Sequence, residues 1–312
     1  MIRKVKNSFL QLFIVKLIAF FAVVFLSDLV IGRLLKKYYF KQESGYYYQT
    51  TYAIDKTEAD ILIFGSSRAA NLFNPEIFEK HFNMSCFNIG RDGHPLFYHY
   101  ALLKANLKRH LPKIVILSFD AGNFSIKQEA YDRLSSLLPY YSYHPEIRPI
   151  VDLKGPNEKV KMLSAIYPYN SLLLPIIAGN SAFSKTKYAT IKGYVPLKEI
   201  IKGPLKTLDY TIEKELDTIK VNTYRAFLKE CRAANIKLYV VCPPYMINAI
   251  GVDYSITTAK KIAQEYNISF FDYSRDTSFI NKPLLFADFR HLNEKGVELL
   301  ANTVIVQINN SK

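Results

Sequence analysis

An apolar segment near the N-terminus, FLQLFIVKLIAFFAVVFLSDLVIGRLL (Phe9 to Leu35), limits how this chain can fold. A helix from Phe9 to Ile31 would be about 34 Å long, which is enough to cross the hydrocarbon core of a bilayer. Lys16 and Asp28 interrupt the segment toward its ends, where a long cation or a carboxylate can reach the headgroups. A cleaved signal peptide is the alternative, but no A-x-A cleavage site follows the apolar run. We therefore predict an uncleaved, single-pass membrane anchor within residues 1–41.

The net charge of the chain is +14, and half of that excess lies around the apolar segment. Residues 1–41 contain eight Lys or Arg and one acidic residue, and the other basic residues form no Arg-rich run. There is no zinc-finger or basic-region pattern, so we expect a lipid bilayer and no nucleic acid among the partners. Charge does not set the orientation, because basic residues flank the segment equally: Arg3, Lys4 and Lys6 before it, and Arg33, Lys36 and Lys37 after it.

Tyrosines are concentrated directly after the apolar segment, at Tyr38, Tyr39 and Tyr46 to Tyr48. Tyrosines of this kind form aromatic belts where a membrane meets water. A packed linker is an equally good interpretation of the same residues. In both cases the folded domain is expected to cover residues 42–312.

The rest of the composition is that of a globular protein, with 49% hydrophobic and 14% aromatic residues. The three cysteines are odd in number and have no CxxC spacing, so they indicate neither a disulfide framework nor a metal site. Cys86 and Cys242 lie in apolar runs and are predicted to be buried. We expect no metal and no cofactor.

Short apolar strands alternate with helical patterns along the domain. The predicted strands cover residues 61–64, 84–90, 113–119, 236–244 and 268–273. Helices are expected after Asn74-Pro75, over residues 94–111 and 210–234, and at the end of the chain, where Asn293 is a possible N-cap. Apolar strands that alternate with helices predict an α/β fold with a parallel sheet covered on both faces.

The segment from Ser125 to about Pro204 breaks this alternation. It is rich in Tyr, Pro and Gly, and it is too long to be a plain connection. We predict that it is an insertion, partly helical, that lies over the carboxyl edge of the sheet.

Polar residues with catalytic potential follow the first predicted strand. Gly65 allows a sharp turn, and Ser66, Ser67 and Arg68 then open a helix, where free backbone N–H groups stabilise negative charge. Simple helix capping by a serine is the alternative. Ligands of open α/β sheets bind at this carboxyl edge, so the segment is a candidate site.

Two other segments are expected at the same edge. The first, NIGRDGHP from Asn88 to Pro95, has two glycines that allow close approach of the backbone, although a plain turn would look the same. The second, LFADFRHLNEKG, places Asp288 three residues before His291. An Asp can accept a proton from one imidazole nitrogen while the other nitrogen faces a hydroxyl. Local turn and helix-start roles are the alternatives for these two residues.

In this order the three segments resemble the blocks of the SGNH, or GDSL-like, hydrolase superfamily. Gly65-Ser66-Ser67 is similar to the first block, with Ser66 in place of the usual Asp; Asn88 to Gly93 is similar to the second; and Asp288 to His291 is similar to the last, DxxH. With the anchor, the chain looks most like the envelope-associated branch, which includes the teichoic-acid D-alanyl transfer protein and alginate-type acetylation proteins. The resemblance covers Asp60 to the C-terminus except the 125–204 insertion.

The resemblance implies a three-layer α/β/α, flavodoxin-like domain with about five parallel strands. It also implies that Ser67 is the nucleophile, that His291 is the general base and then the general acid, and that Asp288 fixes the imidazole tautomer. The backbone N–H groups of Ser67 and Gly93 would form the oxyanion hole.

The third block of the family departs from the usual pattern. The family has GxND, whose Asn donates to the oxyanion, whereas this chain has LSFDAGNF with Asp120 at the Asn position. A carboxylate there would repel an oxyanion, and loss of one donor costs on the order of a hundredfold in rate. Asn123 could replace the donor if the loop turns back. Arg68 is a candidate for holding an anionic substrate, and a structural ion pair is its other interpretation. Asp120 is a second candidate for binding the substrate.

The sequence therefore predicts an anchored acyl-ester hydrolase or O-acyltransferase that acts on an envelope glycopolymer, with its domain outside the cytoplasm. Two alternatives remain open. One is a scaffold that kept the fold and lost activity, which Asp120 favours. The other is an assembly subunit that contacts a membrane-embedded acyltransferase, which Lys16 and Asp28 favour because polar residues in a span often face other helices.

Overall fold

A computed structural model of the chain describes residues 2–181, 190–203, 205–210 and 215–311. Its centre is a five-stranded, fully parallel sheet, in which the strands lie in the order β2-β1-β3-β5-β7. The strands are β1 (Ile61–Phe64), β2 (Cys86–Asn88), β3 (Ile114–Ser118), β5 (Lys237–Cys242) and β7 (Ser269–Asp272). This is the flavodoxin-like order 2-1-3-4-5, and it confirms the predicted parallel sheet.

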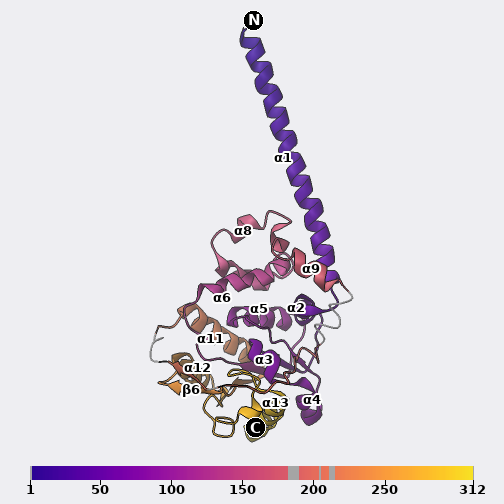
Figure 1. The fold of residues 1–312 in the computed structure, drawn as a ribbon. Coiled ribbons are helices and arrows are strands. Elements are labelled where there is room, and N and C mark those ends of the chain that lie inside the picture. Colours follow the sequence, from indigo (N-terminus) through magenta and orange to yellow (C-terminus); the bar gives the residue numbers. More distant parts are fainter. Residues whose placement is uncertain (1, 182–189, 204, 211–214, 312) are drawn as a thin grey trace.

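Helices cover both faces of the sheet, as the apolar strands require. In β1, Leu62 and Phe64 belong to one buried cluster, and Ile61 and Ile63 belong to another. The first cluster lies under α5 (Leu96–Leu107), α11 (Thr218–Ala233) and α12 (Tyr254–Glu265). The second lies under α4 (Pro75–Phe82) and α13 (Glu294–Asn310). The domain is therefore the predicted three-layer α/β/α sandwich (Figure 1).

The strand register brings the candidate site together. Phe64 pairs with Leu117 of β3, and Ile63 pairs with Asn88 of β2, so the three strands end at the same edge. The loops that begin at Gly65, Ile89 and Phe119 leave the sheet there. Parallel strands thus place segments that lie far apart in the sequence beside one another.

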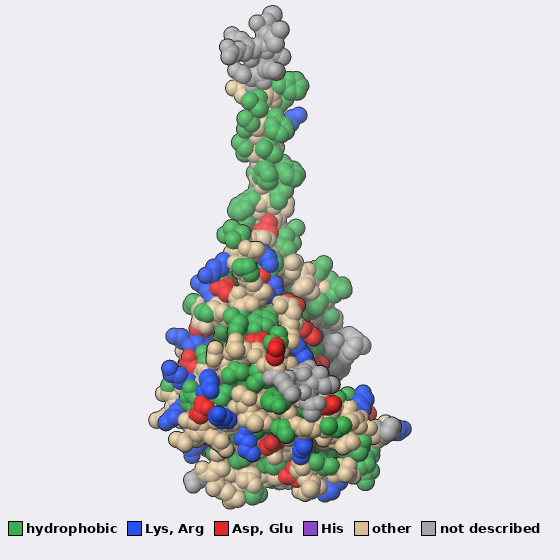
Figure 2. Space-filling view, turned by 90° about the vertical axis from the view of Figure 1, so that its left-hand side faces the viewer, with side chains coloured by type: hydrophobic (Ala, Val, Ile, Leu, Met, Phe, Trp, Pro, Cys, Tyr) green, Lys and Arg blue, Asp and Glu red, His purple; other side chains and the backbone are tan. Residues whose placement is uncertain are grey.

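The N-terminal helix α1 (Ile2–Lys41) is one continuous helix of 40 residues that leaves the domain as a stalk (Figure 1). Its apolar part has a mean hydropathy of 2.6 and is long enough to cross a membrane, although a signal sequence would pass the same test. Figure 2 shows hydrophobic side chains covering the stalk, with one basic side chain projecting from it.

Two of the tyrosines at the end of α1 and in the next helix pack inside the domain instead of forming part of a belt. Tyr39 is only 1% exposed, and its hydroxyl donates to the Tyr140 hydroxyl over 3.2 Å. Tyr47 packs edge-on against Tyr39 from α2 (Gly45–Asp55), a helix that the sequence analysis did not predict. The belt interpretation is therefore wrong for Tyr39 and Tyr47, because both contribute to packing inside the head.

The 125–204 segment folds mainly into short helices that pack on α5 and α1. They are α6 (Gln128–Asp132), η1 (Arg133–Tyr140), η2 (Pro145–Ile147), α7 (Arg148–Val151), η3 (Asp152–Lys154), α8 (Glu158–Lys161), η4 (Tyr167–Tyr169) and α9 (Leu173–Gly179). Residues 182–189 and 204 of this segment lie outside the described residues.

The expected position of this segment is wrong for its middle part, which lies beyond α5, on the side from which α1 leaves (Figure 1). Among its described residues, those near its two ends reach the carboxyl edge. Ser136 contacts His94 near the edge, and Val195 donates its backbone N–H to Ala70 in α3 (Ser67–Leu72). The short helices η1, η2 and α7 bury apolar side chains against α5 instead of against the loops of the edge.

Two other details differ from the prediction. The helix expected over residues 210–234 begins only at Thr218, because Asp217 caps it by accepting from the N–H groups of Ile219 and Lys220; residues 211–214 lie outside the described part. A second, two-stranded parallel sheet joins β4 (Lys206–Asp209) to β6 (Ile247–Ile250). A short turn of helix, η5 (Pro283–Leu285), precedes the DxxH segment.

Candidate active site

The corner between β1 and α3 has a conformation that favours glycine. Gly65 has φ +141°, and a Cβ there would lie 2.8 Å from Ser118. Ser66 then caps α3 by accepting from the Arg68 N–H over 3.2 Å, so Ser67 is the first residue of the helix. The hydroxyl of Ser67 is thereby held at the carboxyl edge.

Ser67, His291 and Asp288 form a continuous hydrogen-bonded series. Ser67 Oγ lies 2.9 Å from His291 Nε2, and His291 Nδ1 lies 2.8 Å from Asp288 Oδ2. The two ends of this series are far apart in the sequence. The arrangement places an imidazole between a hydroxyl and a carboxylate, which is the geometry that activates a serine.

The loop before α13 fixes this geometry through its own backbone. Asp288 Oδ1 accepts from the N–H groups of Arg290, over 2.7 Å, and of His291, over 2.9 Å. The carbonyl of His291 accepts from the Ala287 N–H over 2.8 Å. Asn293 ends the loop by capping α13, as the sequence predicts. Asp288 is therefore held by the chain around it before it contacts the imidazole.

The carboxyl of Asp288 is held in its ionised form. Partial burial raises its pKa, but the hydrogen bonds from the His291 ring and from the Arg290 and His291 backbone outweigh burial and lower the pKa to about 2. Asp288 is therefore a carboxylate at every ordinary pH. It can hold the Nδ1 proton and leave Nε2 free to accept one from Ser67.

The second segment supplies structure as well as a candidate donor. Asn88 is buried and donates to the carbonyls of Ala69 and Phe73, both over 2.8 Å, so it ties β2 to the helix that carries Ser67. Gly93 has φ +66° and faces a small cavity. Within the described residues, the N–H groups of Ser67 and Gly93 donate to no other protein group. Both are therefore available to a ligand.

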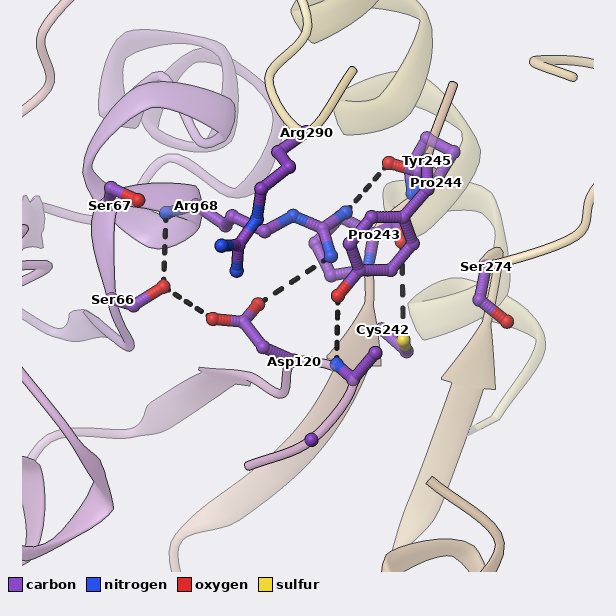
Figure 3. Close-up of polar contacts among 12 residues, drawn as sticks. Ser66, Ser67, Arg68, Asp120, Cys242, Pro243, Pro244, Tyr245, Ser274 and Arg290 are labelled. Carbon is purple, nitrogen blue, oxygen red and sulfur yellow. Dashed lines mark hydrogen bonds and ion pairs between the residues drawn. The ribbon is translucent and has the colours of Figure 1, made fainter. Parts of the chain in front are cut away.

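Arg68 and Asp120 form a buried ion pair directly beneath the serines (Figure 3). Arg68 is 0% exposed; its Nη1 lies 3.6 Å from Asp120 Oδ1, and its Nη2 donates to the Pro244 carbonyl over 2.7 Å. Its guanidinium also stacks 3.5 Å from the centre of the Tyr245 ring. Ser66 Oγ donates to the other carboxylate oxygen of Asp120. This pairing favours the structural interpretation of Arg68, because a fully buried guanidinium cannot reach a substrate.

The loop after Asp120 does turn back, as the Asn123 hypothesis required. Asn123 donates its backbone N–H to the Asp120 carbonyl over 3.2 Å, and Gly122 between them has φ +67°. The Ala121 N–H donates to the Tyr245 hydroxyl over 2.8 Å, which holds the turn against the edge. Asn123 lines the same cavity, of about 240 Å³, as Gly93 and Asp120. It is thus near the predicted oxyanion donors, and its role stays a prediction.

Several basic side chains around this cavity were not identified from the sequence. Arg290 projects over the carboxylate of Asp120 in Figure 3, and it also lines the cavity. Lys127, Arg133 and the buried Lys220 line the same cavity, and Arg133 is paired with Glu129 over 2.7 Å. The position of Arg290 inside the DxxH motif is the only signal that could have indicated it.

The carboxyl edge continues into two larger cavities. One, of about 400 Å³, shares Lys127, Gly122 and Arg290 with the small cavity; the next, of about 610 Å³, shares Tyr210, Tyr245 and Asp253 with the second. Neither of these two larger cavities is lined by Ser67. The three cavities adjoin one another through the residues that they share.

The sequence matches no family model and no curated protein. Solved structures that resemble the fold include a GDSL-like lipase from Bacteroides thetaiotaomicron (9% identity, 86% of this chain and 98% of that one, TM-score 0.41). A lipase/acylhydrolase from Enterococcus faecalis also resembles it (12% identity, 80% of this chain and 95% of that one, TM-score 0.40). So does a psychrotrophic esterase from Pseudoalteromonas sp. (13% identity, 80% of this chain and 96% of that one, TM-score 0.38). Since these TM-scores lie below 0.5, the function proposed for this chain rests on the geometry of its own residues.

Proposed function

We propose that this protein is a membrane-anchored serine acyl-ester hydrolase or O-acyltransferase whose catalytic triad is Ser67, His291 and Asp288. The observation that carries the proposal is the series of contacts from Ser67 Oγ through the imidazole to the Asp288 carboxylate, at 2.9 Å and 2.8 Å. A hydroxyl, an imidazole and an ionised carboxylate in this order are the parts that nucleophilic acyl transfer requires.

In the first half of the reaction, Ser67 Oγ attacks the ester carbonyl carbon while His291 Nε2 takes the hydroxyl proton. The negative charge that develops on the carbonyl oxygen is stabilised by the free N–H groups of Ser67 and Gly93 and by the first turn of α3. When the C–O bond to the alcohol breaks, Nε2 returns the proton to the leaving oxygen. The acyl group is then bound to Ser67.

In the second half, a hydroxyl group removes the acyl group from Ser67. Water or a sugar hydroxyl gives its proton to His291 Nε2 as its oxygen attacks the acyl carbon, and Ser67 Oγ recovers a proton as it leaves. Asp288 keeps Nδ1 protonated throughout and stabilises the imidazolium. Hydrolysis and transfer use the same protein groups and differ only in the hydroxyl that enters.

We propose an acylated cell-envelope glycopolymer as the substrate, with the acyl donor or acceptor reaching the site from the membrane. The apolar helix α1 supports a location at a membrane, and three adjoining cavities, two of them lined by Arg290, support a chain-like substrate. The N-terminus is then in the cytoplasm and the domain outside it. Labelling a Val306→Cys variant with an impermeant maleimide in intact cells tests this, because labelling only after lysis would place the domain inside.

A fluorophosphonate probe tests the reaction itself. The probe forms a covalent bond only with an activated serine, so it should label the wild type and a Ser66→Ala variant but not Ser67→Ala. The matched serines lie side by side, and only Ser67 contacts an imidazole. Labelling of Ser67→Ala at the wild-type rate would assign the reaction to another residue.

An inactive scaffold is the second candidate, and Asp120 at the Asn position of the third block favours it. A folded wild type that does not react with the probe would support that function. The assembly-subunit hypothesis has lost part of its basis, because the Asp28 carboxylate is bonded within the chain to Ser164 over 2.6 Å. Lys16 remains exposed on α1, and co-purification of a membrane protein from detergent would test that hypothesis.

A further inference from the structure

The carboxylate of Asp28 attaches α1 to the 125–204 insertion. Asp28 Oδ1 accepts from Ser164 Oγ over 2.6 Å and from the Ile166 N–H over 3.3 Å, and Oδ2 accepts from the Ala165 N–H over 2.6 Å. Three donors from one turn of the chain thus converge on one carboxylate. Asp28 marks the point on α1 where the exposed stalk ends and contact with the head begins.

The residues that surround the base of α1 form a collar, which we define as residues 158–180. The collar fits α1 closely: a Cβ at Gly32 would lie 2.5 Å from Ala165, and Asn180 Nδ2 donates to the Tyr38 carbonyl over 2.9 Å. The helix α9 lies beside the base of the stalk in Figure 1, and η4 also contacts α1. The collar therefore has a fixed position relative to α1 from Asp28 to Tyr38.

The collar exposes large apolar side chains that the head does not cover. Leu163 is 81% exposed and Leu174 is 77% exposed, and Val160, Leu173 and Ile177 are also exposed. In α9, only Ile176 is buried, so the short helix is apolar on its outer side as well. Clustered exposure of this kind on a folded domain usually marks an interaction surface.

The apolar surface of the collar is continuous with that of the stalk. From Phe9 to Ser27, α1 would be about 28 Å long, close to the roughly 30 Å of a hydrocarbon core. Asp28 then lies at the boundary, and the collar that holds it lies at the same level. Beyond that level α1 exposes basic side chains, Arg33, Lys36 and Lys37, which suit the headgroup region.

We propose that the collar inserts its exposed apolar side chains into the interface of the same bilayer that α1 crosses, with Leu163 and Leu174 as the deepest. The occupant of this surface is lipid, because the apolar side chains continue the membrane-spanning surface and basic side chains follow on the domain side. The inference rests on the anchoring part of the proposed function and does not depend on the triad.

Fluorescence quenching by brominated lipids in nanodiscs tests the proposal with the full chain. We would attach an environment-sensitive dye to single cysteines in Leu163→Cys and Leu174→Cys variants; the three native cysteines are buried. Phe21→Cys in the stalk is the positive control. Val306→Cys in α13, on the opposite face of the sheet, is the negative control for an exposed apolar side chain.

We expect lipids brominated near the headgroups to quench the dyes at 163 and 174 severalfold more than the dye at 306. Quenching at 21 but not at 163 or 174 would overturn the collar proposal and leave the anchor intact. Absence of quenching at all four positions would overturn the anchor as well. Reaction of each variant with a fluorophosphonate separates both outcomes from failure of the proposed catalysis.

A second copy of the chain could cover the collar and protect it from quenching. Crosslinking between the 174 cysteines would detect that arrangement, which would also overturn the proposal.

Discussion

The guanidinium of Arg68 and the carboxylate of Asp120 are paired inside the protein, with Arg68 Nη1 3.6 Å from Asp120 Oδ1. In the resemblance to the SGNH superfamily, Asp120 takes the position of an asparagine donor, and its negative charge would oppose the proposed catalysis if it faced the substrate alone. The pairing compensates the charge, and Ser66 Oγ binds the second carboxylate oxygen. Asp120 is therefore an internal support for the turn that carries Ser67.

Asp120→Asn should destabilise the protein, because it leaves the fully buried guanidinium of Arg68 without a counter-charge. Removing one partner of a buried ion pair costs about 3 kcal/mol, which corresponds to a Tm lower by roughly 6 °C. Acyl-ester turnover should fall as well, because Arg68 is the residue after Ser67. Thermal unfolding followed by circular dichroism and p-nitrophenyl acetate turnover measure both effects.

The double variant Arg68→Met/Asp120→Asn provides the control for this prediction. If the two residues support each other, the double variant should lose less stability than the sum of the two single variants. Additive losses, or an Asp120→Asn variant that is more active and equally stable, would show that Asp120 acts on the substrate as an unwanted charge.

Ser67→Ala should reduce p-nitrophenyl acetate turnover by at least about a thousandfold, since it removes the proposed nucleophile. His291→Ala should cause a loss of similar size, and the double variant should be no slower, because the groups act as one unit. Ser66→Ala is the matched control. It removes an N-cap worth about 1 kcal/mol and should cost less than about tenfold in turnover. Equal activity in Ser67→Ala and the wild type would eliminate the triad.

The pH profile of kcat/KM should show no titration of Asp288 above pH 4. The pKa of Asp288 is lowered to about 2, so its interaction with His291 is fully present above the unfolded value of 3.8 and is lost only as the pH falls toward 2. The Asp288 carboxylate should therefore stay ionised over the whole acid range above pH 4. Protonation of that carboxyl within this range, followed by NMR, would contradict the prediction. Asp288→Asn should reduce kcat by about 10⁴-fold, as loss of the orienting carboxylate does in other serine triads.

Acid should destabilise the protein through two buried histidines. Burial lowers the pKa of His99 to about 3 and that of His94 to about 2, and Arg91 contributes to both shifts. Because the unfolded chain binds these protons near pH 6.5, the stability is present above pH 6.5 and is lost as the pH falls toward these values. Each histidine should then cost about 2 kcal/mol between pH 7 and pH 5.

His99→Phe tests the acid effect while keeping an aromatic ring next to Phe64, which His99 contacts edge-on. The variant should lose about 2 kcal/mol less than the wild type when the pH is lowered from 7 to 5. Thermal unfolding at the two pH values gives the difference. An identical loss in both proteins would mean that His99 binds its proton in the folded state too.

Local sequence signals predicted the sheet and the segments of the candidate site. The apolar run Ile61–Phe64 before Gly65 indicated a buried strand and a sharp corner, and the DxxH spacing indicated a turn that faces a hydroxyl. Parallel strands end at one edge by geometry, so the meeting of Ser67 and His291 followed from the fold. The bond from Ser66 to Asp120 could not be predicted, because its direction depends on side-chain rotamers.

Features that depend on distant partners were missed. All four residues of β4 (Lys206–Asp209) are exposed, so no apolar pattern marked the strand, and only its pairing with Ile247–Ile250 creates it. Asp28 was interpreted as a polar residue facing another membrane helix, whereas its partner Ser164 lies in the same chain. In both cases the stabilising contact joins segments whose local sequence carries no sign of each other.

In the proposed function, the unbroken helix from Ile2 to Lys41 sets the distance at which the folded domain lies from the membrane. A flexible linker would let the domain move over a range of distances from the membrane. A continuous helix that packs closely against the collar at Gly32 holds the domain at one distance and leaves it free to rotate about the helix axis. Ser67 would then reach only ester groups that lie in a thin layer parallel to the membrane. Ester groups farther from the membrane would lie outside the reach of Ser67. Glycines inserted after Lys41 should widen this layer only when the contact of Asp28 with Ser164 is also removed, for example by Asp28→Ala.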